Sequence, residues 1–332
     1  MHHTRIIVCG GGNIAHSLVA AIARHEEVDV LTRQPGRWSH SVNDSPHRVC
    51  ATDDVAGVAT AEVVLVAVPQ FAVESQFARM RPYLKPGQLV CFVPANSLMP
   101  TLCDEAKSIG VDIACFQRVP YIARIREYGK LVAMSAPRTN HRVFLSSEAP
   151  RGVLDDLCRR IFEAPANYLR SPLTFVFNNS NPLLHPARMV VLFRDWRDCV
   201  YTENPLFYAE WTDESSERYI AADREMFKVL QTAEPSGACA ADYEDVLTHY
   251  GVRSARELTA KLRSIESLAT IRSPMKQEGT MWFPDFESRY FTEDVEYGLK
   301  PILDWAQRCR VSTPALELLA EELEVIRRGG DV

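Results

Sequence analysis

The first half of the chain alternates short apolar runs with stretches of helical spacing. Strands that are buried on both faces of a sheet are apolar throughout, whereas half-buried strands alternate apolar and polar residues. The stretches between the runs repeat apolar residues at helical spacing, as in Ile14, Leu18 and Ile22. This order predicts a parallel sheet with helices on both faces. The expected strands are Arg5–Cys9, Val28–Arg33, Glu62–Pro69, Gln88–Asn96, Val111–Phe116 and Lys130–Ala136.

Beyond about residue 170 the strand pattern stops and helical patterns replace it. Residues 171–196 read as irregular segments followed by an apolar helix. Within 254–268, Ser254 and Glu257 match a capping box, and apolar residues recur along one face of the expected helix. A last helix begins with Pro314, a residue that is favoured in the first position of a helix. The second half is therefore expected to be mostly helical.

These patterns define the expected fold class. It is α/β, with an N-terminal Rossmann-type doubly wound parallel sheet followed by a mostly α-helical C-terminal domain. A chain of 332 residues is long enough for two domains with separate cores. We assign residues 1–168 to a dinucleotide-binding domain and residues 169–332 to a helical domain that carries catalysis and substrate binding.

A glycine-rich turn joins the first expected strand to the first expected helix. Gly10, Gly12 and Ala15 fill the pattern G-x-G-x-x-G/A, in which the first glycine permits a tight turn and the second lets a pyrophosphate approach the backbone. Ala15 is small enough for the helix to pack on the strand, and the helix N-terminus offers free N–H groups to phosphates. Together with Asn13, these residues are predicted to bind the cofactor.

The end of the second strand indicates which cofactor is bound. Sheets that bind NAD usually carry an acidic residue there, which takes the ribose hydroxyls. Here Thr32 and Arg33 occupy this place, and an arginine can pair with a 2′-phosphate. We therefore expect NADP(H) to be favoured over NAD(H). Pro69 also lies just beyond a strand end, where it either lines the cofactor site or simply ends the strand.

Composition narrows the range of functions. The chain carries 37 Lys and Arg and 43 Asp and Glu, for a net charge of -6, and no basic block suggests a nucleic-acid partner. Its nine cysteines are scattered without a CxxC pair, which favours reduced thiols in the cytoplasm over disulfides or a metal site. The chain enters a strand at once and no apolar run approaches about 20 residues, so neither a signal peptide nor a membrane span is expected.

Two segments of the second half carry candidate chemistry. The stretch "NNSNPLLHPARMV" places His185 between two prolines, and the segment "PDFESRYFTEDVEYGLK" holds Arg289 and Asp294. Asp294 is expected in the first turn of a helix from about Glu293, where the helix dipole favours a carboxylate. On spacing alone, Asp294 could simply mark the start of a helix, and His185 could be a loop histidine with a structural hydrogen bond.

Taken together, these motifs resemble the opine dehydrogenase family, which includes the octopine and nopaline dehydrogenases. The resemblance rests on "GGGNIAH", on "NPLLHP" at 181–186 and on "SRYFTEDVEYGLKPI" at 288–302, with a weaker match at "VPYIAR". It implies an enzyme that joins a 2-oxo acid to the amine of an amino acid through an imine, which NAD(P)H reduces.

The resemblance also implies roles for individual residues. His185 and Asp294 correspond to the catalytic pair of the family, Arg289 would hold a substrate carboxylate, and we add Asn181 to the substrate site. Histidine titrates near neutral pH, which suits the proton transfers of this reaction. We expect His185 and Asp294 to form a hydrogen bond, and His185 to face a cleft between the two domains.

Other functions remain open from the sequence. A ketopantoate-reductase-like enzyme would share the two-domain plan but would use a catalytic lysine, and a non-catalytic module could bind NADP(H) as a sensor. The expected partners are the two small-molecule substrates, with no nucleic acid and no membrane, and the chain could form a homodimer. The identity of the oxo acid and of the amine is left open.

Overall fold

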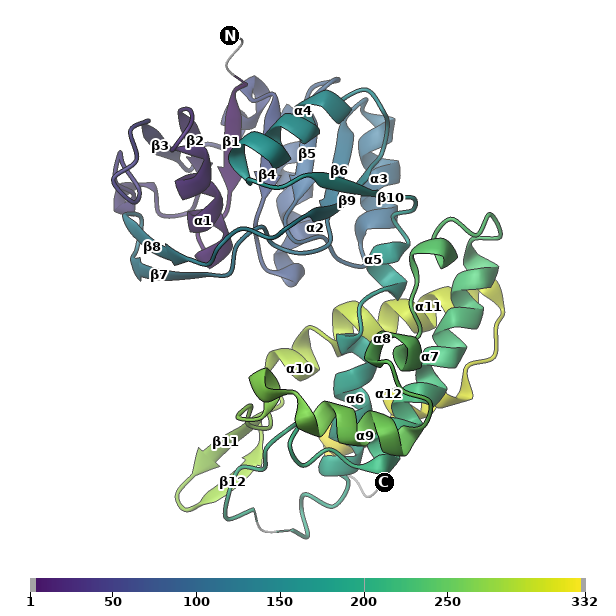
Figure 1. The fold of residues 1–332 in the computed structure, drawn as a ribbon. Coiled ribbons are helices and arrows are strands. Elements are labelled where there is room, and N and C mark those ends of the chain that lie inside the picture. The colour runs from purple at the N-terminus through teal and green to yellow at the C-terminus, as the bar shows by residue number, and fades with distance from the viewer. Residues whose placement is uncertain (1–3, 200, 330–332) are drawn as a thin grey trace. The chain divides into compact units, whose positions relative to one another are not determined.

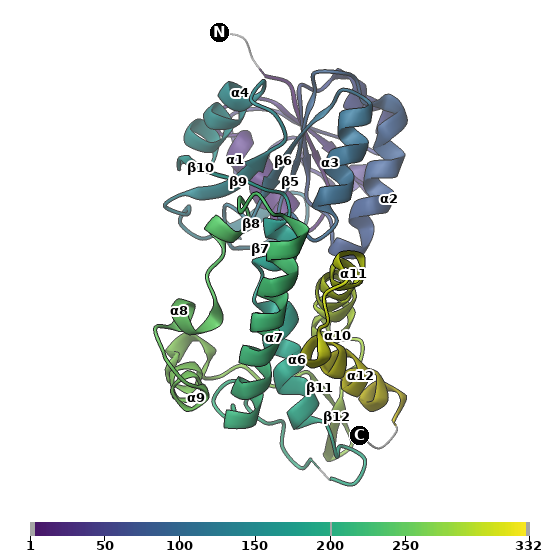
Figure 2. The same cartoon turned by 90° about the vertical axis from the view of Figure 1, so that its right-hand side faces the viewer.

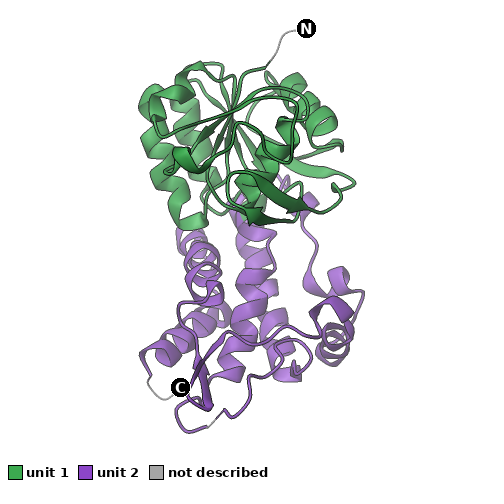
Figure 3. Ribbon diagram, turned by 90° about the vertical axis from the view of Figure 1, so that its left-hand side faces the viewer, with its two compact units in different colours: residues 1–175 green, residues 176–332 purple. Residues whose placement is uncertain are grey.

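A computed structural model describes residues 4–199 and 201–329 of the chain. The chain divides into two compact units, Met1–Phe175 and Val176–Val332, shown in different colours in Figure 3. The sequence placed the boundary after Tyr168, which lies within strand β10 (Ala166–Leu169). Leu169 and Phe175 pack into the core of the first unit, so the chain leaves that unit later than the sequence pattern suggested.

The first unit is built on an eight-stranded sheet with the order β10-β9-β6-β5-β4-β1-β2-β3 (Figure 1). Neighbouring strands are parallel, except that β9 runs antiparallel to β6. The remaining strands are β1 (Ile6–Cys9), β2 (Val28–Leu31), β3 (Val49–Thr52), β4 (Val63–Val66), β5 (Leu89–Phe92), β6 (Asp112–Phe116) and β9 (His141–Leu145). Five of the six strands expected from the sequence lie in this sheet.

The sixth expected strand, Lys130–Ala136, was wrongly placed in the parallel sheet. Its ordered part, β8 (Leu131–Met134), pairs antiparallel with β7 (Ala123–Glu127) in a separate hairpin. Leu131 is 45% exposed while Val132 is buried, so only one face of β8 is covered. A strand inside the sheet would be buried on both faces.

The two faces of the sheet carry separate apolar cores. Along β1, Ile6 and Val8 point to one face and Ile7 and Cys9 to the other, because side chains alternate along a strand. Helices α1 (Asn13–Ile22) and α4 (Arg151–Asp156) cover the first face, while α2 (Gln70–Met80) and α3 (Met99–Ser108) cover the second (Figure 2).

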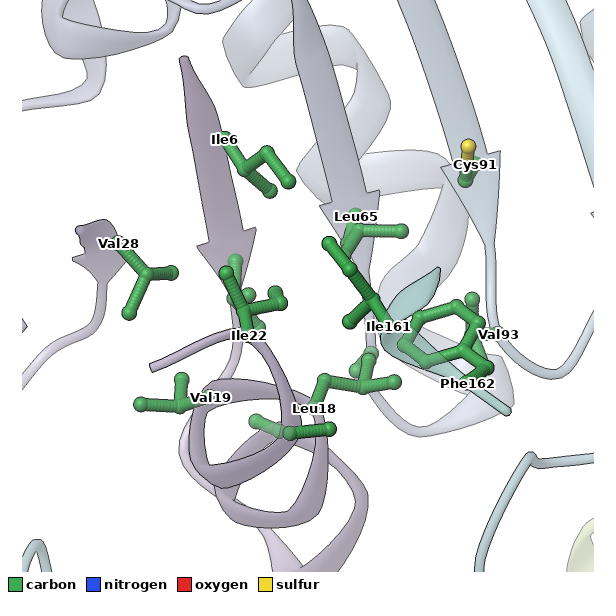
Figure 4. Close-up of a cluster of buried hydrophobic side chains, with 14 of the residues drawn as sticks. Ile6, Leu18, Val19, Ile22, Val28, Leu65, Cys91, Val93, Ile161 and Phe162 are labelled. Atoms are coloured by element: carbon green, nitrogen blue, oxygen red, sulfur yellow. The ribbon is translucent and has the colours of Figure 1, made fainter. Parts of the chain in front are cut away.

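The first of these cores holds α1 against the sheet. Leu18 and Ile22 of α1 pack with Ile6 of β1, with Leu65 of β4 and with Phe162 (Figure 4). All five side chains are at most 2% exposed, and burying an aliphatic or aromatic side chain of this size contributes about 1.5–3 kcal/mol. This packing fixes the N-terminus of α1, where the glycine-rich turn lies.

The second unit is mostly helical, as predicted. Its elements are α5 (Thr174–Phe177, which crosses the boundary), α6 (Asn181–Leu192), α7 (Asp213–Ala233), α8 (Val246–Tyr250), α9 (Ala255–Ser264), α10 (Arg289–Thr292), α11 (Lys300–Cys309), α12 (Pro314–Arg328) and the hairpin β11 (Met275–Glu278) with β12 (Met281–Pro284). Helix α6 contacts α7 and α12. No described helix combines the length and apolar character that a membrane crossing needs.

Two helix boundaries differ from the sequence interpretation. Ser254 caps α9 by accepting a hydrogen bond from the Glu257 amide (3.2 Å), but the helix ends at Ser264 rather than at residue 268. The segment expected to start near Glu293 instead begins at Arg289 with α10, continues through a π-helical turn, η7 (Val295–Leu299), and joins α11.

Candidate functional site

The glycine-rich turn has the geometry that a dinucleotide requires. Gly10 has a φ of +145°, and a Cβ there would lie 2.3 Å from the carbonyl oxygen of Ala67 at the end of β4. A Cβ on Gly12 would meet nothing within 4 Å, so space is open beside the first turn of α1. Ala15 is fully buried. The first glycine therefore serves the tight turn, and the second leaves the backbone accessible to a ligand.

The other predicted cofactor residues lie at the same edge of the sheet. Thr32 and Arg33 follow β2 and Pro69 follows β4, on either side of β1. In parallel sheets ligands bind beyond the carboxyl ends of the strands, where the strand order reverses. Thr32 is buried, whereas Arg33 is exposed, and its guanidinium has no hydrogen bond or ion pair with residues 4–199 or 201–329.

Two polar side chains in α1 are committed to the β7–β8 hairpin. Asn13 Oδ1 accepts a hydrogen bond from the Ile125 amide (2.8 Å), so this side chain has a structural task beside the predicted one. His16 Nε2 accepts from the Gly129 amide (2.8 Å) while Nδ1 donates to the Gly12 carbonyl (2.9 Å). Burial lowers the pKa of His16. A neutral imidazole whose two nitrogens both form hydrogen bonds to the backbone has a structural role.

The motif "NPLLHP" is helical rather than irregular, which corrects the sequence interpretation. Helix α6 begins at Asn181, with Pro182 in its first turn and Pro186 inside it. A proline in the first turn removes no helical hydrogen bond, because backbone N–H groups there have no partner within the helix. Pro186 lies further along and removes one internal hydrogen bond. His185 and Asn181 are four residues apart and therefore share one face of α6.

His185 lies at the centre of a buried hydrogen-bonded group. Its Nδ1 donates to Oδ2 of Asp294 (2.7 Å), and both side chains are at most 7% exposed. The expected hydrogen bond between these two residues is therefore present. Its Nε2 lies 3.1 Å from the hydroxyl of Tyr208. The Asp294 carboxylate accepts from Nδ1 and so keeps the proton of the neutral ring on that nitrogen. Nε2 is then left to accept a hydrogen bond from the tyrosine O–H.

Aromatic rings enclose the imidazole. The ring of Tyr290 lies 4.1 Å from that of His185 and the ring of Phe207 lies 5.6 Å from it. Tyr290 and Asp294 are four residues apart in the same motif, so one face of α10 and its continuation supplies both contacts. Burial raises the pKa of the Tyr208 hydroxyl, and Tyr290 adds to this effect. Tyr208 therefore stays a neutral O–H donor near neutral pH.

Asp294 reaches His185 because its segment packs unusually close to α6. The Asp294 carbonyl accepts from the Leu299 amide (2.9 Å), five residues ahead, which is the spacing of a π-helical turn. Such turns occur frequently at functional sites. Gly298 lies in this turn, and a Cβ on it would lie 2.3 Å from Cγ of Pro182. Only glycine therefore allows the present approach of η7 to the first turn of α6.

The two predicted substrate residues are available rather than buried. The Arg289 side chain is 65% exposed, and its one ion pair within the described part of the chain is a long contact of 3.8 Å with Glu293. The Asn181 side chain is partly buried and forms no hydrogen bond with the described residues. The sequence suggested that Asp294 lies in the first turn of a helix. The helix instead begins earlier, at Arg289, so Asp294 lies beyond its first turn.

The sequence interpretation missed four residues of this group, of which Tyr290 lies in a motif and the others do not. Tyr208 and Phe207 come from an irregular segment that carries no motif, and nothing in their spacing pointed to His185. Arg188 is 3% exposed and donates from Nε to the Phe207 carbonyl (3.3 Å). Burial lowers the pKa of Arg188 to about 10. This arginine holds the segment that presents Tyr208. No group of three metal-binding side chains occurs among the described residues.

Two family models match parts of the chain. Residues 168–326 match the family described as NAD/NADP octopine/nopaline dehydrogenase, alpha-helical domain. Residues 5–93 match the family described as NADP oxidoreductase, coenzyme F420-dependent. The first match includes His185, Arg289 and Asp294, and the second includes the glycine-rich turn.

Individual relatives cover nearly the whole chain. An opine dehydrogenase of Haliotis discus hannai is 26% identical, over 93% of this chain and 86% of the relative. An octopine dehydrogenase of Mizuhopecten yessoensis is 25% identical, over 89% of this chain and 83% of the relative.

Solved structures share the fold. Octopine dehydrogenase, solved with NADH and L-arginine, superimposes with a TM-score of 0.84 at 23% identity, over 98% of this chain and 90% of that one. A ketopantoate reductase from Ralstonia eutropha JMP134 has the same general fold, with a TM-score of 0.60 at 15% identity, over 98% of this chain and 99% of that one.

Proposed function

We propose that this chain, whose residues 168–326 match the family described as NAD/NADP octopine/nopaline dehydrogenase, alpha-helical domain, is an opine-type dehydrogenase. It condenses a 2-oxo acid with the amine of an amino acid and reduces the resulting imine with NAD(P)H. The observation that carries the proposal is the buried His185–Asp294 hydrogen bond of 2.7 Å, with the exposed guanidinium of Arg289 five residues before Asp294. Solved octopine dehydrogenase complexes hold NADH with L-arginine, pyruvate or agmatine.

The proposed reaction needs proton transfer at a controlled position. Imine formation releases the carbonyl oxygen as water, which requires a proton, and the attacking amine must lose one. His185 takes up and returns these protons at Nε2, while Asp294 fixes the tautomer and stabilises the imidazolium. Arg289 binds a substrate carboxylate, for which a guanidinium offers two parallel hydrogen bonds. Asn181, on the same face of α6 as His185, is proposed as a further substrate contact.

The residues at the glycine-rich turn fit a nicotinamide dinucleotide. Gly10, Gly12 and the N-terminus of α1 would hold its pyrophosphate, since the space beside Gly12 is open, and Thr32, Arg33 and Pro69 would lie along its adenosine half. When bound, the nicotinamide supplies the hydride for the imine. The proposal requires the glycine-rich turn and His185 to come together over the substrates, which stays a prediction.

We expect NADPH to bind more tightly than NADH, through the guanidinium of Arg33, which has no partner among the described residues. Arg33→Ala should weaken NADPH binding by about 1.5–3 kcal/mol, the range for hydrogen bonds to charged groups, and leave NADH binding nearly unchanged. Titration of each cofactor by fluorescence measures both affinities. Arg48→Ala is the matched control. Arg48 is exposed and precedes β3, so it lies at the amino ends of the strands, away from the carboxyl ends where Arg33 lies.

An acidic residue near Arg33 makes this experiment decisive. Thr52 pairs with Leu31 in the register of β2 and β3, so Asp53 follows β3 beside the end of β2. A carboxylate there could accept hydrogen bonds from the hydroxyls of a ribose that has no 2′-phosphate. A preference for NADH that survives Arg33→Ala would therefore reject the NADP(H) assignment and point to Asp53.

We expect Tyr208 to affect catalysis through its hydrogen bond with His185. Tyr208→Phe removes the O–H that occupies Nε2 but keeps the ring, so we expect turnover to fall roughly 2- to 10-fold, equivalent to one hydrogen bond of about 0.5–1.5 kcal/mol, with an altered pH–rate profile. Tyr201→Phe is the control, since that hydroxyl donates to the Leu192 carbonyl (2.7 Å). An unchanged rate and profile in Tyr208→Phe would leave this hydroxyl a purely structural role.

The lysine-based alternative has less support. The lysines of the helical unit, Lys228, Lys261, Lys276 and Lys300, are all exposed, and Lys276 and Lys300 form surface ion pairs with Glu278 and Glu296. A catalytic lysine usually requires burial to shift its pKa. A sensor without catalysis would not need a buried histidine–carboxylate pair beside an exposed arginine.

A screen of 2-oxo acids against amino acids, followed by NADPH absorbance, tests the proposed function. Oxidation with an oxo acid alone would instead favour the ketopantoate-reductase-like alternative. We keep the cytoplasm as the proposed location, because the cysteines among the described residues form no disulfide. A homodimer stays a prediction that sedimentation can test.

A further inference from the structure

The β7–β8 hairpin lies outside the main sheet and is fastened to α1 (Figure 1). Its Ile125 amide donates to Asn13 Oδ1 (2.8 Å), and the amide of Gly129, in its turn, donates to His16 Nε2 (2.8 Å). These residues all belong to the first unit. The hairpin therefore has a fixed place beside the glycine-rich turn, although it adds no strand to the sheet.

The turn of this hairpin also holds the segment that follows β2. The Gly129 carbonyl accepts from the Ser39 amide (3.0 Å). Gly129 has a φ of +74°, and a Cβ on it would clash with the carbonyl oxygen of Arg37, so only glycine allows this close approach. Residues 35–39 are thereby held against the hairpin. They follow the end of β2, where sheets of this kind recognise the 2′ position of the adenosine ribose.

Tyr128, also in the turn of the hairpin, connects Arg37 to the glycine-rich turn. A Cβ on Gly11 would lie 2.6 Å from the Tyr128 hydroxyl oxygen and 3.2 Å from Oγ1 of Thr32, so both hydroxyls lie beside that turn. The Arg37 guanidinium lies 4.1 Å from the centre of the Tyr128 ring, which is a cation–π contact. It also donates from Nη1 to Gln34 Oε1 (2.8 Å). Two contacts therefore position Arg37 next to the predicted cofactor site.

The positive charge of Arg37 is left for a ligand. Its side chain is exposed and forms no ion pair with residues 4–199 or 201–329. The contact with Gln34 uses one N–H of the guanidinium and leaves the others free to donate to an anion. Arg33 is exposed as well, but no contact within the described residues orders its side chain, so binding must restrict it at a cost in conformational entropy. Arg37 has already met most of that cost.

We infer that Arg37, positioned by Tyr128, is the main determinant of a preference for a cofactor that carries a 2′-phosphate. The inference rests on the NADP(H) assignment within the proposed function and adds the β7–β8 hairpin to the residues that set it. A phosphate accepts strong, charge-assisted hydrogen bonds from a guanidinium. Tyr128 acts through Arg37 and is a positioning residue, which needs no contact of its own with the cofactor.

Two fragments of the cofactor test this inference without any need for turnover. 5′-AMP and adenosine 2′,5′-bisphosphate differ only in the 2′-phosphate. Calorimetric titration of each into the protein should show the bisphosphate binding at least about tenfold more tightly, as expected for hydrogen bonds between charged groups. Arg37→Ala should lower this ratio of affinities by more than Arg33→Ala does, and both variants should keep the native affinity for 5′-AMP.

Substitutions of Tyr128 distinguish positioning from a purely structural role. Tyr128→Leu removes the aromatic ring and should lower the ratio about 2- to 5-fold, in line with an exposed cation–π contact, while the affinity for 5′-AMP stays unchanged. Tyr128→Phe keeps the ring and should keep the ratio. Tyr83→Leu is the matched control, since Tyr83 is 40% exposed and lies in η3 (Arg81–Tyr83), which follows α2 at the amino ends of the strands.

The outcomes separate the inference from the proposed function. Equal affinities for the two fragments in the native protein, a ratio that Arg37→Ala retains, or an equal loss of both affinities in a Tyr128→Leu variant that still unfolds cooperatively would overturn the inference. If Tyr128→Leu does not fold, Arg37→Ala and Arg33→Ala decide the matter. The expected ratios in a protein that condenses no oxo acid with an amine would sustain the inference and reject the function. Reductive condensation with NADH, together with equal fragment affinities, would do the reverse.

Discussion

Replacing His185 with alanine should lower turnover by about 10²- to 10⁴-fold, the usual contribution of a general acid–base group, while NADPH binds almost as tightly as before. We propose that Nε2 of this buried imidazole exchanges protons with the substrate, and its partner Asp294 lies 2.7 Å from Nδ1. The cofactor phosphates are assigned to the turn at Gly10 and Gly12, in the other unit. Steady-state rates at saturating substrates and a fluorescence titration of NADPH measure the two effects separately.

A surface histidine provides the matched control for this variant. His249 forms the same kind of contact, with Nδ1 3.0 Å from Oε2 of Glu244, but both side chains are more than half exposed. His249→Ala should keep near-native turnover. If His185→Ala also retains near-native turnover with both substrates saturating, the acid–base role is wrong and the lysine-based alternative gains ground.

The neighbours of His185 should give different kinetic signatures. Asp294→Asn should resemble His185→Ala, because an amide can orient the ring but cannot stabilise its positive charge. Arg289→Ala should raise the apparent KM for the carboxylate substrate as well as slow the reaction, as expected when a contact made in the ground state is lost. Identical effects on KM and turnover in all three variants would contradict these separate roles.

Gly298→Ala should damage both stability and catalysis. Its Cβ would lie 2.3 Å from Cγ and 2.7 Å from Cβ of Pro182, so η7 must move away from α6. Overpacking of this kind costs about 1–3 kcal/mol. The movement would shift Asp294 relative to His185, and a misplacement of about 1 Å can lower a rate by about 10²-fold. Urea unfolding and turnover, measured on the same preparation, report the two effects.

Gly152→Ala is the control for this variant. Gly152 lies within α4 and a Cβ there would meet nothing within 4 Å. Replacing a glycine by alanine at an unstrained helical position is expected to stabilise a protein by about 0.4–1 kcal/mol. Native-like stability and turnover in Gly298→Ala would show that the contact between Pro182 and the π-helical turn does not position the pair.

The sheet was predictable from the sequence where its strands are buried on both faces. Strands such as β4 and β5 are apolar runs between helical stretches, and that pattern has few alternatives. Strands β9 and β10 were missed, because polar residues interrupt "HRVFL" and "ANYL", as is common for strands near a sheet edge. Strand β8 was assigned to the wrong sheet, since a short apolar run does not reveal its pairing partner.

The site was predictable only in part. The contact between His185 and Asp294 could be predicted because each lies in a motif that resembles a known family, whereas the role of Arg289 stays a prediction. The glycine-rich turn has a spacing with a clear physical purpose. Tyr290 was within reach, since it precedes Asp294 by four residues and must share its helix face. Tyr208 had no signal, because its contact with His185 depends on packing between segments and not on spacing along the chain.

An assay in which each component is omitted in turn measures the proposed activity directly. Purified protein is incubated with NADPH, a 2-oxo acid and an amino acid, together and with each component omitted, while NADPH absorbance and product mass are followed. We predict oxidation only in the complete mixture, with a product whose mass equals that of the oxo acid plus the amino acid, less one water and plus two hydrogens. Oxidation that proceeds without the amino acid, or a product that is only the hydroxy acid, would contradict reductive condensation.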